Sequence, residues 1–520
     1  MNYQINGVAL RLCAAAVAAC LLGPAAAAPA PAQTHARVIV AFKPGNAASV
    51  KATIAAARGK VKLDLPALDA IAIEIPARAL PYLRGNPHVA YIEEDVKRYP
   101  FALSSPSRQP YLPGQRVPYG IPMVQADQLP DTYAANRKLC IIDSGYDRSH
   151  EDLAANPADG IYDRGTGWWY TDENNHGTHV AGTIAAINNS GTGVVGVAPN
   201  RRLKLHIVKV FGAEGWAYSS SLANAAKQCG DAGANVISMS LGGALPSQTE
   251  VRAFVALEMR GVLSVAAAGN DGNGTVTYPA GYPSVLMVGA LDENMAWAPF
   301  SQYNHKVELS APGVSVLSTV PMGSGTEPSL KVGSTDYAPG AMTGSPRTSA
   351  SAVLADFGLG MAINPAVNGK VCLIARGDID FGTKVANCQK SGGVGAVVYN
   401  NVAGGFAGTL GQTVTTIPSV TASDSEGAAL RRQLGQLAMV AVKPVHYAYY
   451  DGTSMATPHV SAVAALVWSY FPNCSGQQIR ASLGKSALDL GLKGRDEQYG
   501  HGLVQARAAY NRIGKLGCGN

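Results

Sequence analysis

The sequence predicts an α/β protein whose largest domain is a doubly wound, mostly parallel sheet, with a small α+β unit before it and a β-rich α+β unit inserted into it. Through the middle of the chain, short apolar segments rich in Val and Ile alternate with helical segments. The 520 residues exceed the size at which one hydrophobic core stops growing. Between about residues 320 and 446 the pattern becomes Gly-rich and strand-heavy, which indicates a separate unit.

The composition is that of a folded protein. Hydrophobic residues make up 47% of the chain and charged residues 15%, which is too apolar for intrinsic disorder. The formal charge of +6 is spread along the chain without a dense block of Lys or Arg. A phosphate-binding stripe is therefore absent, and we expect no nucleic-acid partner.

The N-terminus predicts a signal peptide over residues 1–28. Arg11 precedes the apolar stretch 12–23, and the Ala-rich segment 25–28 has the small residues of a signal-peptidase site. A membrane anchor is one alternative, but the apolar stretch is shorter than the roughly 20 residues that span a bilayer. A lipoprotein signal at Cys20 is another. We expect a secreted, extracellular protein with no membrane attachment after signal removal.

Cysteine usage agrees with export. Six cysteines remain once the signal is removed, an even number suited to three disulfides in an oxidising compartment. Other connectivities stay open on sequence alone. The favoured pairs are Cys372 with Cys388, which are close in sequence, Cys474 with Cys518, which would hold the C-terminal tail, and the remaining Cys140 with Cys229.

The first unit is expected over residues 36–99. It has a strand at 37–42, a helical stretch at 49–57 and an alternating strand at 70–75. The stretch 100–118, rich in Pro, Ser and Gly, is typical of a linker. A compact unit between a signal peptide and a larger domain suggests a prodomain, with a free-standing binding module as the alternative.

The main domain is expected over residues 105–320 and 446–520. Its strands include KLCIID, NVISMSL and VLMVGA, which are short and apolar, as buried parallel strands are. The sites of such sheets lie beyond the carboxyl ends of the strands. Residues 321–445 form the expected insertion.

Three local sequences carry residues suited to nucleophilic catalysis. Asp143 ends an apolar strand and enters a Ser-Gly turn. His176, in NNHGTHVAGT, begins a helix and has the imidazole that a general base near neutral pH requires. Ser454, in GTSMATPHV, opens a long helix whose N-terminal potential favours a nucleophilic hydroxyl.

Each of these residues has a plainer interpretation when taken alone. Asp143 could form a turn and Ser454 could cap a helix. His176 and His179 have a spacing seen in metal sites, but no third ligand follows in register. Together the three residues stand in the order Asp, His, Ser, which is one of the chain orders of catalytic triads.

The chain resembles the subtilisin-like serine proteases (subtilases, peptidase S8 family). Its segments DSG, HGTHVAGT and GTSMATPHV are similar to the three signature segments of that family, and VAAAGNDG is similar to the fourth. The resemblance implies that Asp143 orients the imidazole, His176 acts as general base and then acid, and Ser454 attacks the scissile carbonyl. It also implies that the Asn270 side-chain amide and the Ser454 N–H stabilise the oxyanion.

The segment ISMSLGG resembles the strand that borders the substrate peptide in this family, where main-chain pairing supplies affinity. No nest of carboxylates is evident near it, so we expect an apolar or aromatic residue before the cut. Thr277 aligns with the base of that pocket. The expected substrate-binding residues are Ser240, Leu241, Gly242, Ala267 and Gly269.

Structural calcium is implied by the same resemblance. Asp152 and Asn189 match positions of calcium ligands in the family, and carbonyls of the loop 187–194 would complete an all-oxygen shell. The alternative is that NNSGTG is only a turn. No organic cofactor is expected.

The flanking units resemble companions of this family. Residues 36–99 are similar to the inhibitory prodomain, and residues 321–445 are similar to protease-associated (PA) domains. The resemblance implies a zymogen that processes itself and then, as a monomer, hydrolyses proteins and peptides. Two rivals are a catalytically silent binding protein, disfavoured because all four catalytic positions are filled, and a selective processing protease.

Overall fold

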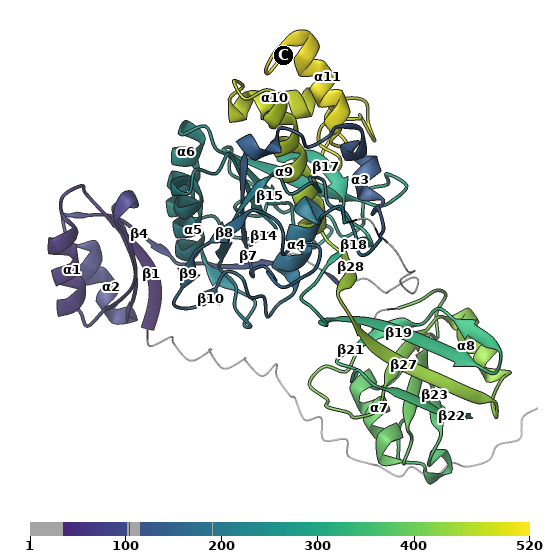
Figure 1. The fold of residues 1–520 in the computed structure, drawn as a ribbon. Helices are drawn as coiled ribbons and strands as arrows, with labels where there is room; N and C mark the ends of the chain where they lie inside the picture. The colour runs from purple at the N-terminus through teal and green to yellow at the C-terminus, as the bar shows by residue number, and fades with distance from the viewer. Residues whose placement is uncertain (1–34, 101–102, 105–114, 190, 407) are drawn as a thin grey trace, which may run out of the picture.

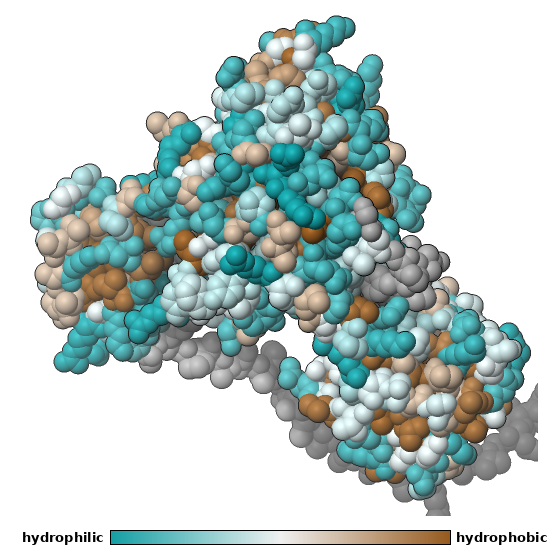
Figure 2. Space-filling model, viewed as in Figure 1, coloured by the Kyte–Doolittle hydropathy of each residue, from teal (hydrophilic) through white to brown (hydrophobic). Residues whose placement is uncertain are grey.

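The structure is a computed structural model that describes residues 35–100, 103–104, 115–189, 191–406 and 408–520. Figure 1 shows three units: an N-terminal unit at the left, a central unit, and an inserted unit at the lower right. In Figure 2, hydrophilic residues cover most of the visible face of the central unit. The predicted signal peptide lies outside the described residues.

The N-terminal unit is a four-stranded antiparallel sheet in the order β2-β3-β1-β4. Alternate residues of a strand point to opposite faces. Val40 therefore packs under helix α1, whereas Ile39 and Ala41 pack against Ala223 and Ala253 of the central unit. The elements are β1 (His35–Phe42), α1 (Ala47–Ala56), β2 (Lys60–Leu65), β3 (Ala70–Pro76), α2 (Leu80–Arg84) and β4 (Val89–Glu94).

The central unit is built on a seven-stranded sheet in the order β17-β16-β15-β13-β7-β11-β8, with every neighbouring pair parallel. The confirmed fold class follows from its strands, which, apart from the edge strand β8, are buried along nearly their whole length. They are β7 (Lys138–Asp143), β8 (Ala158–Gly160), β11 (Lys204–Lys209), β13 (Val236–Met239), β15 (Leu263–Ala267), β16 (Val285–Leu291) and β17 (Val307–Pro312).

Helices cover both faces of this sheet. Alternate residues of β7 belong to different cores: Ile141 packs with α4 and α9, and Ile142 packs with α5 and α6. Among the described helices, none has the length and apolar character needed to cross a membrane. The helices are α3 (Gly120–Met123), α4 (His176–Ala185), α5 (Ser219–Asp231), α6 (Gln248–Met259), α9 (Thr453–Tyr470), α10 (Gly476–Ser486) and α11 (Ala506–Leu516); β9 (Tyr162–Asp163) and β10 (Gly167–Trp168) form a small hairpin.

The inserted unit has its own nine-stranded sheet, in the order β20-β19-β27-β22-β23-β24-β26-β21-β25. Ser423 begins α8 with a capping box, and Asp380 caps α7. Its elements are β19 (Gly325–Val332), β20 (Thr335–Tyr337), β21 (Gly340–Thr343), β22 (Ser349–Asp356), β23 (Val371–Ala375), α7 (Phe381–Lys390), β24 (Gly395–Tyr399), β25 (Gly408–Thr409), β26 (Ser419–Ala422), α8 (Asp424–Arg431) and β27 (Leu437–Val445).

A two-stranded stem joins the inserted unit to the central unit. The chain leaves through β18 (Val316–Thr319) and returns through β28 (Tyr447–Asp451), and these strands pair antiparallel. β28 ends just before Ser454 at the start of α9. The insertion is therefore attached next to the predicted nucleophile.

The three predicted disulfides are confirmed. Cys140–Cys229 joins β7 to α5, and Cys372–Cys388 joins β23 to α7. Cys474–Cys518 ties the turn between α9 and α10 to the segment after α11. Each pair brings together elements that also pack against each other.

Candidate active site

Asp143 and His176 form a buried pair at the carboxyl end of the central sheet. Asp143 is the last residue of β7, and its Oδ1 lies 2.7 Å from Nδ1 of His176. The backbone N–H of Ser144 donates to the same oxygen at 2.7 Å. A carboxylate held in this way fixes the orientation of the imidazole and leaves Nε2 as the opposite ring nitrogen. The two side chains are 0% and 2% exposed.

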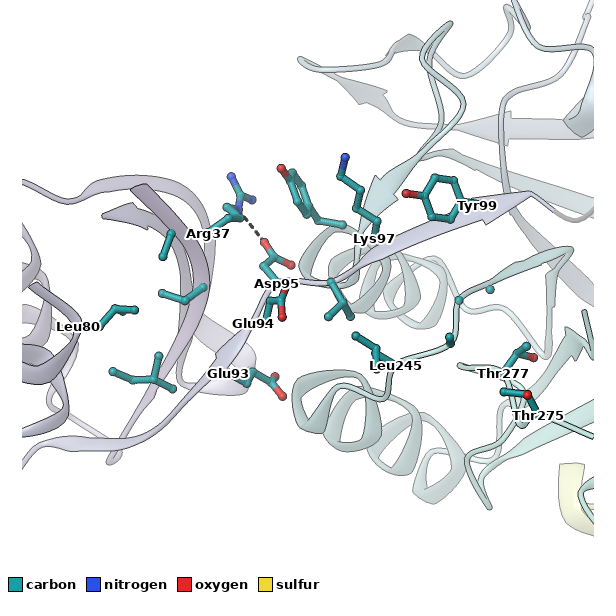
Figure 3. A pocket seen from close by; sticks show the side chains of 18 of the residues that line it. Arg37, Leu80, Glu93, Glu94, Asp95, Lys97, Tyr99, Leu245, Thr275 and Thr277 are labelled. Atoms are coloured by element: carbon teal, nitrogen blue, oxygen red, sulfur yellow. Dashed lines mark hydrogen bonds and ion pairs between the residues drawn. The ribbon is translucent and has the colours of Figure 1, made fainter. Parts of the chain in front are cut away.

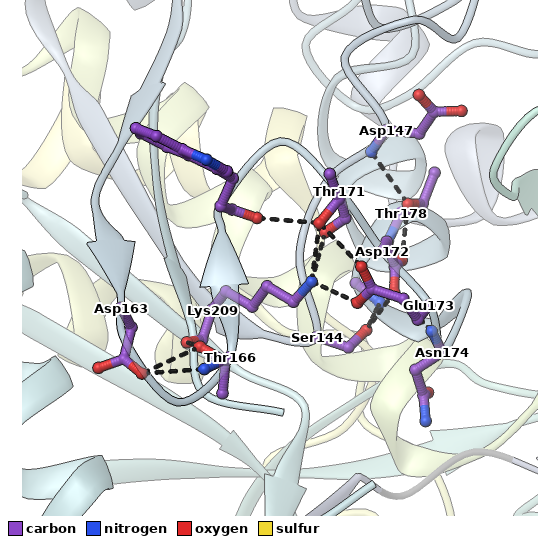
Figure 4. A network of polar contacts seen from close by, with 12 residues as sticks. Ser144, Asp147, Asp163, Thr166, Thr171, Asp172, Glu173, Asn174, Thr178 and Lys209 are labelled. Atoms are coloured by element: carbon purple, nitrogen blue, oxygen red, sulfur yellow. Dashed lines mark hydrogen bonds and ion pairs between the residues drawn. The ribbon is translucent and has the colours of Figure 1, made fainter. Parts of the chain in front are cut away.

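Asp172 holds the two segments that carry this pair (Figure 4). Its Oδ1 accepts from Ser144 Oγ at 2.8 Å and from the backbone N–H groups of Asn174 and Asn175. Its Oδ2 accepts from the Thr178 backbone N–H and hydroxyl at 2.8 and 2.7 Å. The carboxylate thus joins the turn after β7 to the first turn of α4, where a negative charge is also favoured by the helix dipole. The sequence gives one signal for this role, an acidic residue just before a helix.

Ser454 lies in the first turn of α9 and exchanges two hydrogen bonds with Ser240. Its hydroxyl donates to the Ser240 carbonyl at 2.8 Å, and the Ser240 hydroxyl donates to the Ser454 carbonyl at 2.8 Å. The second bond is possible because Pro458, four residues on, has no N–H to donate to the Ser454 carbonyl. The proline therefore lets Ser240 fix the nucleophile's backbone.

The structure gives no hydrogen bond between His176 and Ser454. Nε2 of His176 is buried and has no partner among the described residues. In an enzyme without substrate, catalytic hydrogen bonds are often long and form only in the reactive complex. The Ser454 hydroxyl would have to leave the Ser240 carbonyl and reach Nε2 for a relay to form.

Asn270 is fixed beside the nucleophile by its neighbour in α9. Its Oδ1 accepts from the Thr453 backbone N–H at 3.0 Å and from the Thr453 hydroxyl at 2.9 Å. The side-chain NH₂ is thus the end of the amide turned away from Thr453. Together with the Ser454 backbone N–H at the helix N-terminus, it forms a pair of donors suited to an oxyanion.

The chain's own segment β5 (Lys97–Pro100) lies between two strand edges beside this site. It pairs antiparallel with β14 (Leu241–Gly242) on one side and with β12 (Ala217–Tyr218) on the other. In the register, Tyr99 faces Gly242 and Pro100 faces Leu241. Ser240, whose carbonyl accepts from the Ser454 hydroxyl, comes directly before Leu241 in the chain. The C-terminal end of β5 is therefore the end that lies nearer to Ser240.

The chain continues to the other side of Ser454. β6 (Leu103–Ser104) pairs antiparallel with β28, and Leu103 faces Asp451. These residues fall in the stretch predicted as a linker, and that prediction is wrong for them because their pairing depends on a strand more than 300 residues away in sequence. Residues 101 and 102 lie outside the described residues.

Two carboxylates of the N-terminal unit cap helices of the central unit, beside the pocket between them (Figure 3). Asp95 accepts from the Ser220 N–H and hydroxyl at the start of α5, and also from Arg37 at 2.8 Å. Glu93 accepts from the backbone N–H groups of Gln248 and Thr249 at the start of α6. These charged caps satisfy helix-terminal N–H groups from outside the unit.

Two of the expected substrate-binding residues lie at and just beyond the end of β15. Ala267 ends β15, and Gly269 adopts a φ of +110°. A Cβ at Gly269 would meet Gln302 Oε1 at 2.5 Å, so the backbone there approaches its neighbours closely. Thr277 is 3% exposed and donates its hydroxyl to the Ala268 carbonyl at 2.7 Å. The hydroxyl of Thr277 is therefore engaged in this hydrogen bond.

Oxygen atoms converge around Gln115. Its Nε2 lies 3.0 Å from the Ile187 carbonyl, 3.2 Å from Asn189 Oδ1 and 3.5 Å from the Val194 carbonyl. A side-chain amide can present either its nitrogen or its oxygen. Amide and carbonyl oxygens such as these are among the ligands that a calcium ion takes. Gln115 was missed by the sequence reasoning because it lies in the predicted linker.

Asp152 lies next to these oxygens. Its Oδ1 accepts from Asn189 Nδ2 at 2.7 Å, and its Oδ2 accepts from the Val194 N–H at 2.8 Å. Burial raises the pKa of this carboxyl, although its hydrogen bonds act in the opposite direction. No cluster of three or more His, Cys, Asp or Glu side chains suits a metal in the described residues, so a calcium site would depend on amides and carbonyls. The residues present fit such a site.

His179, whose spacing from His176 is seen in metal sites, contacts two backbone carbonyls. Its Nε2 lies 3.0 Å from the Val316 carbonyl and 3.1 Å from the Ala448 carbonyl, and its ring stacks on Tyr450. Burial lowers its pKa to about 3. His179 thus fastens α4 to the stem strands as a neutral imidazole.

Comparison with known proteins gives matches to the central unit and to the inserted unit. The sequence model of the subtilase family matches residues 135–357 and 429–502, and that of the PA domain matches residues 333–430. Subtilisin NAT of Bacillus subtilis subsp. natto is 37% identical over 300 residues, which cover 56% of this chain and 74% of that protein. An alkaline protease of Alkalihalobacillus alcalophilus is 40% identical over 258 residues, covering 48% and 62%.

Solved structures agree. The psychrophilic subtilisin-like protease Apa1 of the Antarctic psychrotroph Pseudoalteromonas sp. AS-11 is 42% identical with a TM-score of 0.59, and the match covers 78% of this chain and all of that one. Fervidolysin of Fervidobacterium pennivorans, described as a keratinolytic enzyme, has the same TM-score at 24% identity, covering 92% of this chain and 61% of that one. The second match supports the fold alone.

Proposed function

This chain belongs to the subtilase family and is a serine-type endopeptidase, and we propose that it is a secreted precursor that first cuts itself and then other proteins with Asp143, His176 and Ser454. The observation that carries the proposal is the path of the chain across the site. Residues 97–100 pair with β12 and β14, and residues 103–104 pair with β28, the strand that leads to Ser454.

The residues would act as follows. Nε2 of His176 takes the proton of the Ser454 hydroxyl as Oγ attacks the substrate carbonyl, while Asp143 holds Nδ1. The oxyanion forms beside the Asn270 amide and the Ser454 N–H. The imidazolium then gives its proton to the leaving amine, and an acyl-enzyme remains. Water, deprotonated by the same imidazole, releases the acid and restores Ser454.

The strand register predicts where the precursor is cut. Pro100 faces Leu241, and Ser240, whose carbonyl accepts from the Ser454 hydroxyl, comes directly before Leu241. We therefore expect the first cut after Phe101. An aromatic residue at this point fits the apolar or aromatic preference expected of the pocket.

The N-terminal unit would inhibit the enzyme after that cut. β5 would remain between β12 and β14 as a bound product, and no substrate could use the same edges. The caps by Glu93 and Asp95 would hold the unit in place. Release or digestion of the unit would then start general proteolysis.

Secretion is supported by the segment over residues 1–28 and by the three disulfides, which suit an oxidising compartment. We further propose that Gln115, Asp152 and Asn189, with the Ile187 and Val194 carbonyls, hold a calcium ion. Such an ion would neutralise the buried carboxylate and stabilise the fold.

The test is Ser454→Ala in the full chain. This variant should accumulate as a precursor that retains residues 36–101, whereas the wild type should yield a mature enzyme that hydrolyses casein and is labelled by a serine-directed phosphonate. Ser461→Ala, which removes a hydroxyl two turns along the same helix, is the control and should mature. Maturation of purified Ser454→Ala at the wild-type rate would refute self-cutting, and an unlabelled, inactive wild type would refute the enzyme assignment.

A further inference from the structure

Arg98 is the residue of β5 whose side chain turns into the protein. It is 1% exposed, whereas Lys97 and Tyr99 on either side of it lie at the surface. This alternation is that of a strand with one buried face. Because β5 occupies the edges that a substrate would use, the buried position is the fourth before the proposed cut.

The guanidinium of Arg98 meets a carboxylate of the central unit in a bidentate pair. Nε donates to Glu250 Oε1 at 3.0 Å, and Nη2 donates to Glu250 Oε2 at 2.7 Å. Nη1 donates to the Lys97 carbonyl at 3.2 Å. Glu250 is 0% exposed, so the two charges meet away from water. Planar, fork-shaped contact of this kind suits arginine and not lysine.

Glu250 is prepared for such a partner by its own unit. It lies in the first turn of α6, where a negative charge is favoured, and Ser247 caps that helix. The Tyr282 hydroxyl donates to Glu250 Oε2 at 2.8 Å. Burial raises the pKa of the Glu250 carboxyl, and Arg98 opposes that rise. Among the described residues, Arg98 is the cation that forms an ion pair with Glu250.

Glu250 remains when β5 leaves. Its buried carboxylate would then keep the hydrogen bond from the Tyr282 hydroxyl but lose its cation. A substrate with a neutral fourth residue would leave a buried charge unpaired, which costs more than a lost surface contact. An arginine in that position would restore both hydrogen bonds.

We propose that Glu250 forms the base of a subsite that selects arginine at the fourth position before the cut, in substrates as in the precursor. The proposal rests on the proposed function, because the register of β5 defines the position. It makes the enzyme more selective than a general protease, since both an aromatic residue at the cut and an arginine three residues earlier would be recognised.

The experiment uses the mature enzyme and four chromogenic peptides that copy residues 99–101 before the cut, with Arg, Lys, citrulline or Leu in the preceding position. Citrulline has the shape of arginine without its charge. We expect kcat/KM for the Arg peptide to exceed that for the citrulline and Leu peptides by at least about 30-fold, as for a buried charge left unpaired. Lys should fall in between. Similar kcat/KM for Arg and citrulline would overturn the proposal.

Glu250→Gln should reduce the Arg preference to about 3-fold or less. The matched control is Glu258→Gln on the same helix, which should keep the full preference. A preference that persists in folded Glu250→Gln would also overturn the proposal. The comparison of peptides on the wild type needs no variant, so a variant that fails to fold does not affect it. Phosphonate labelling of Ser454 with no preference would refute this inference alone, whereas no cleavage and no labelling would refute the proposed function.

Discussion

Two buried histidines near the site have structural roles as neutral rings. His179 bonds to the Val316 and Ala448 carbonyls, and His459 Nδ1 bonds to the Met455 carbonyl within α9. Burial lowers their pKa values to about 3 and about 4. Both rings therefore stay uncharged in the folded state down to a pH at which an unfolded histidine is already protonated.

This difference predicts a loss of stability in mild acid. Below pH 6.5 the unfolded state takes up two protons that the folded state does not, so unfolding becomes easier by about 1.4 kcal/mol per pH unit for each ring. From pH 6.5 to 5 the free energy of unfolding should fall by about 4 kcal/mol. Urea unfolding of the Ser454→Ala precursor, which cannot digest itself, would measure it.

His305→Asn is the control for that series, because His305 is exposed and its replacement should leave the pH dependence unchanged. Equal unfolding free energies at pH 6.5 and pH 5 would contradict the role assigned to the buried rings.

Among individual residues, the sequence predicts those that stand in long local motifs. The segments around Asp143, His176 and Ser454 are long and specific enough to identify. Asp172 and Glu250 escape such reasoning, because each acquires its role only when a turn, a helix or a strand from elsewhere in the chain is placed beside it.

At the scale of elements, α5 and α6 begin at the boundary with the N-terminal unit, which supplies acceptors to their first N–H groups. Asp95 and Glu93 supply charged acceptors to both helices. A hydrogen bond to a charged group contributes about 1.5–3 kcal/mol. The caps should therefore govern how long the cut N-terminal unit stays bound.

Replacement of both carboxylates by amides, as Glu93→Gln with Asp95→Asn, should shorten the lag between self-cutting and casein hydrolysis by about tenfold or more. Gel analysis of the cut and a continuous casein assay would separate the two events. Glu94→Gln, a change at the exposed neighbour, should leave the lag as in the wild type. An unchanged lag in the double variant would mean that the caps do not control release.

Apart from β8, whose sequence ADG has no apolar run, most strands of the central sheet are predictable because runs of Val and Ile between turns identify them. β5, β6, β12 and β14 are not. They are two to four residues long and are stabilised by partners far away in sequence, so no local pattern reports them.

At the scale of the whole molecule, Gln115 contacts the loop that carries Asn189, and Asn189 in turn contacts Asp152. Calcium held there would join the start of the central unit to its core. An ion that binds only the folded state at 100 times its Kd contributes about 2.7 kcal/mol. Removal of calcium should lower the Tm of the mature enzyme by about 5–10 °C.

Calorimetry of the phosphonate-inhibited enzyme, with calcium or with chelator, would measure this shift. Asp152→Asn should lower the Tm in calcium and remove most of the response to chelator, whereas Asp163→Asn at a surface turn should keep the response. A wild-type Tm that is the same in both buffers would rule out the ion.

The pairing of β18 with β28 bears on how the molecule can be divided. Thr319 faces Tyr447 in the register, so the chain departs from the catalytic body and re-enters it at neighbouring points. A tight turn of about two residues could bridge that gap and leave a plain hairpin. A chain with such a turn in place of residues 320–446 should therefore keep the sheet and helices that hold Asp143, His176 and Ser454.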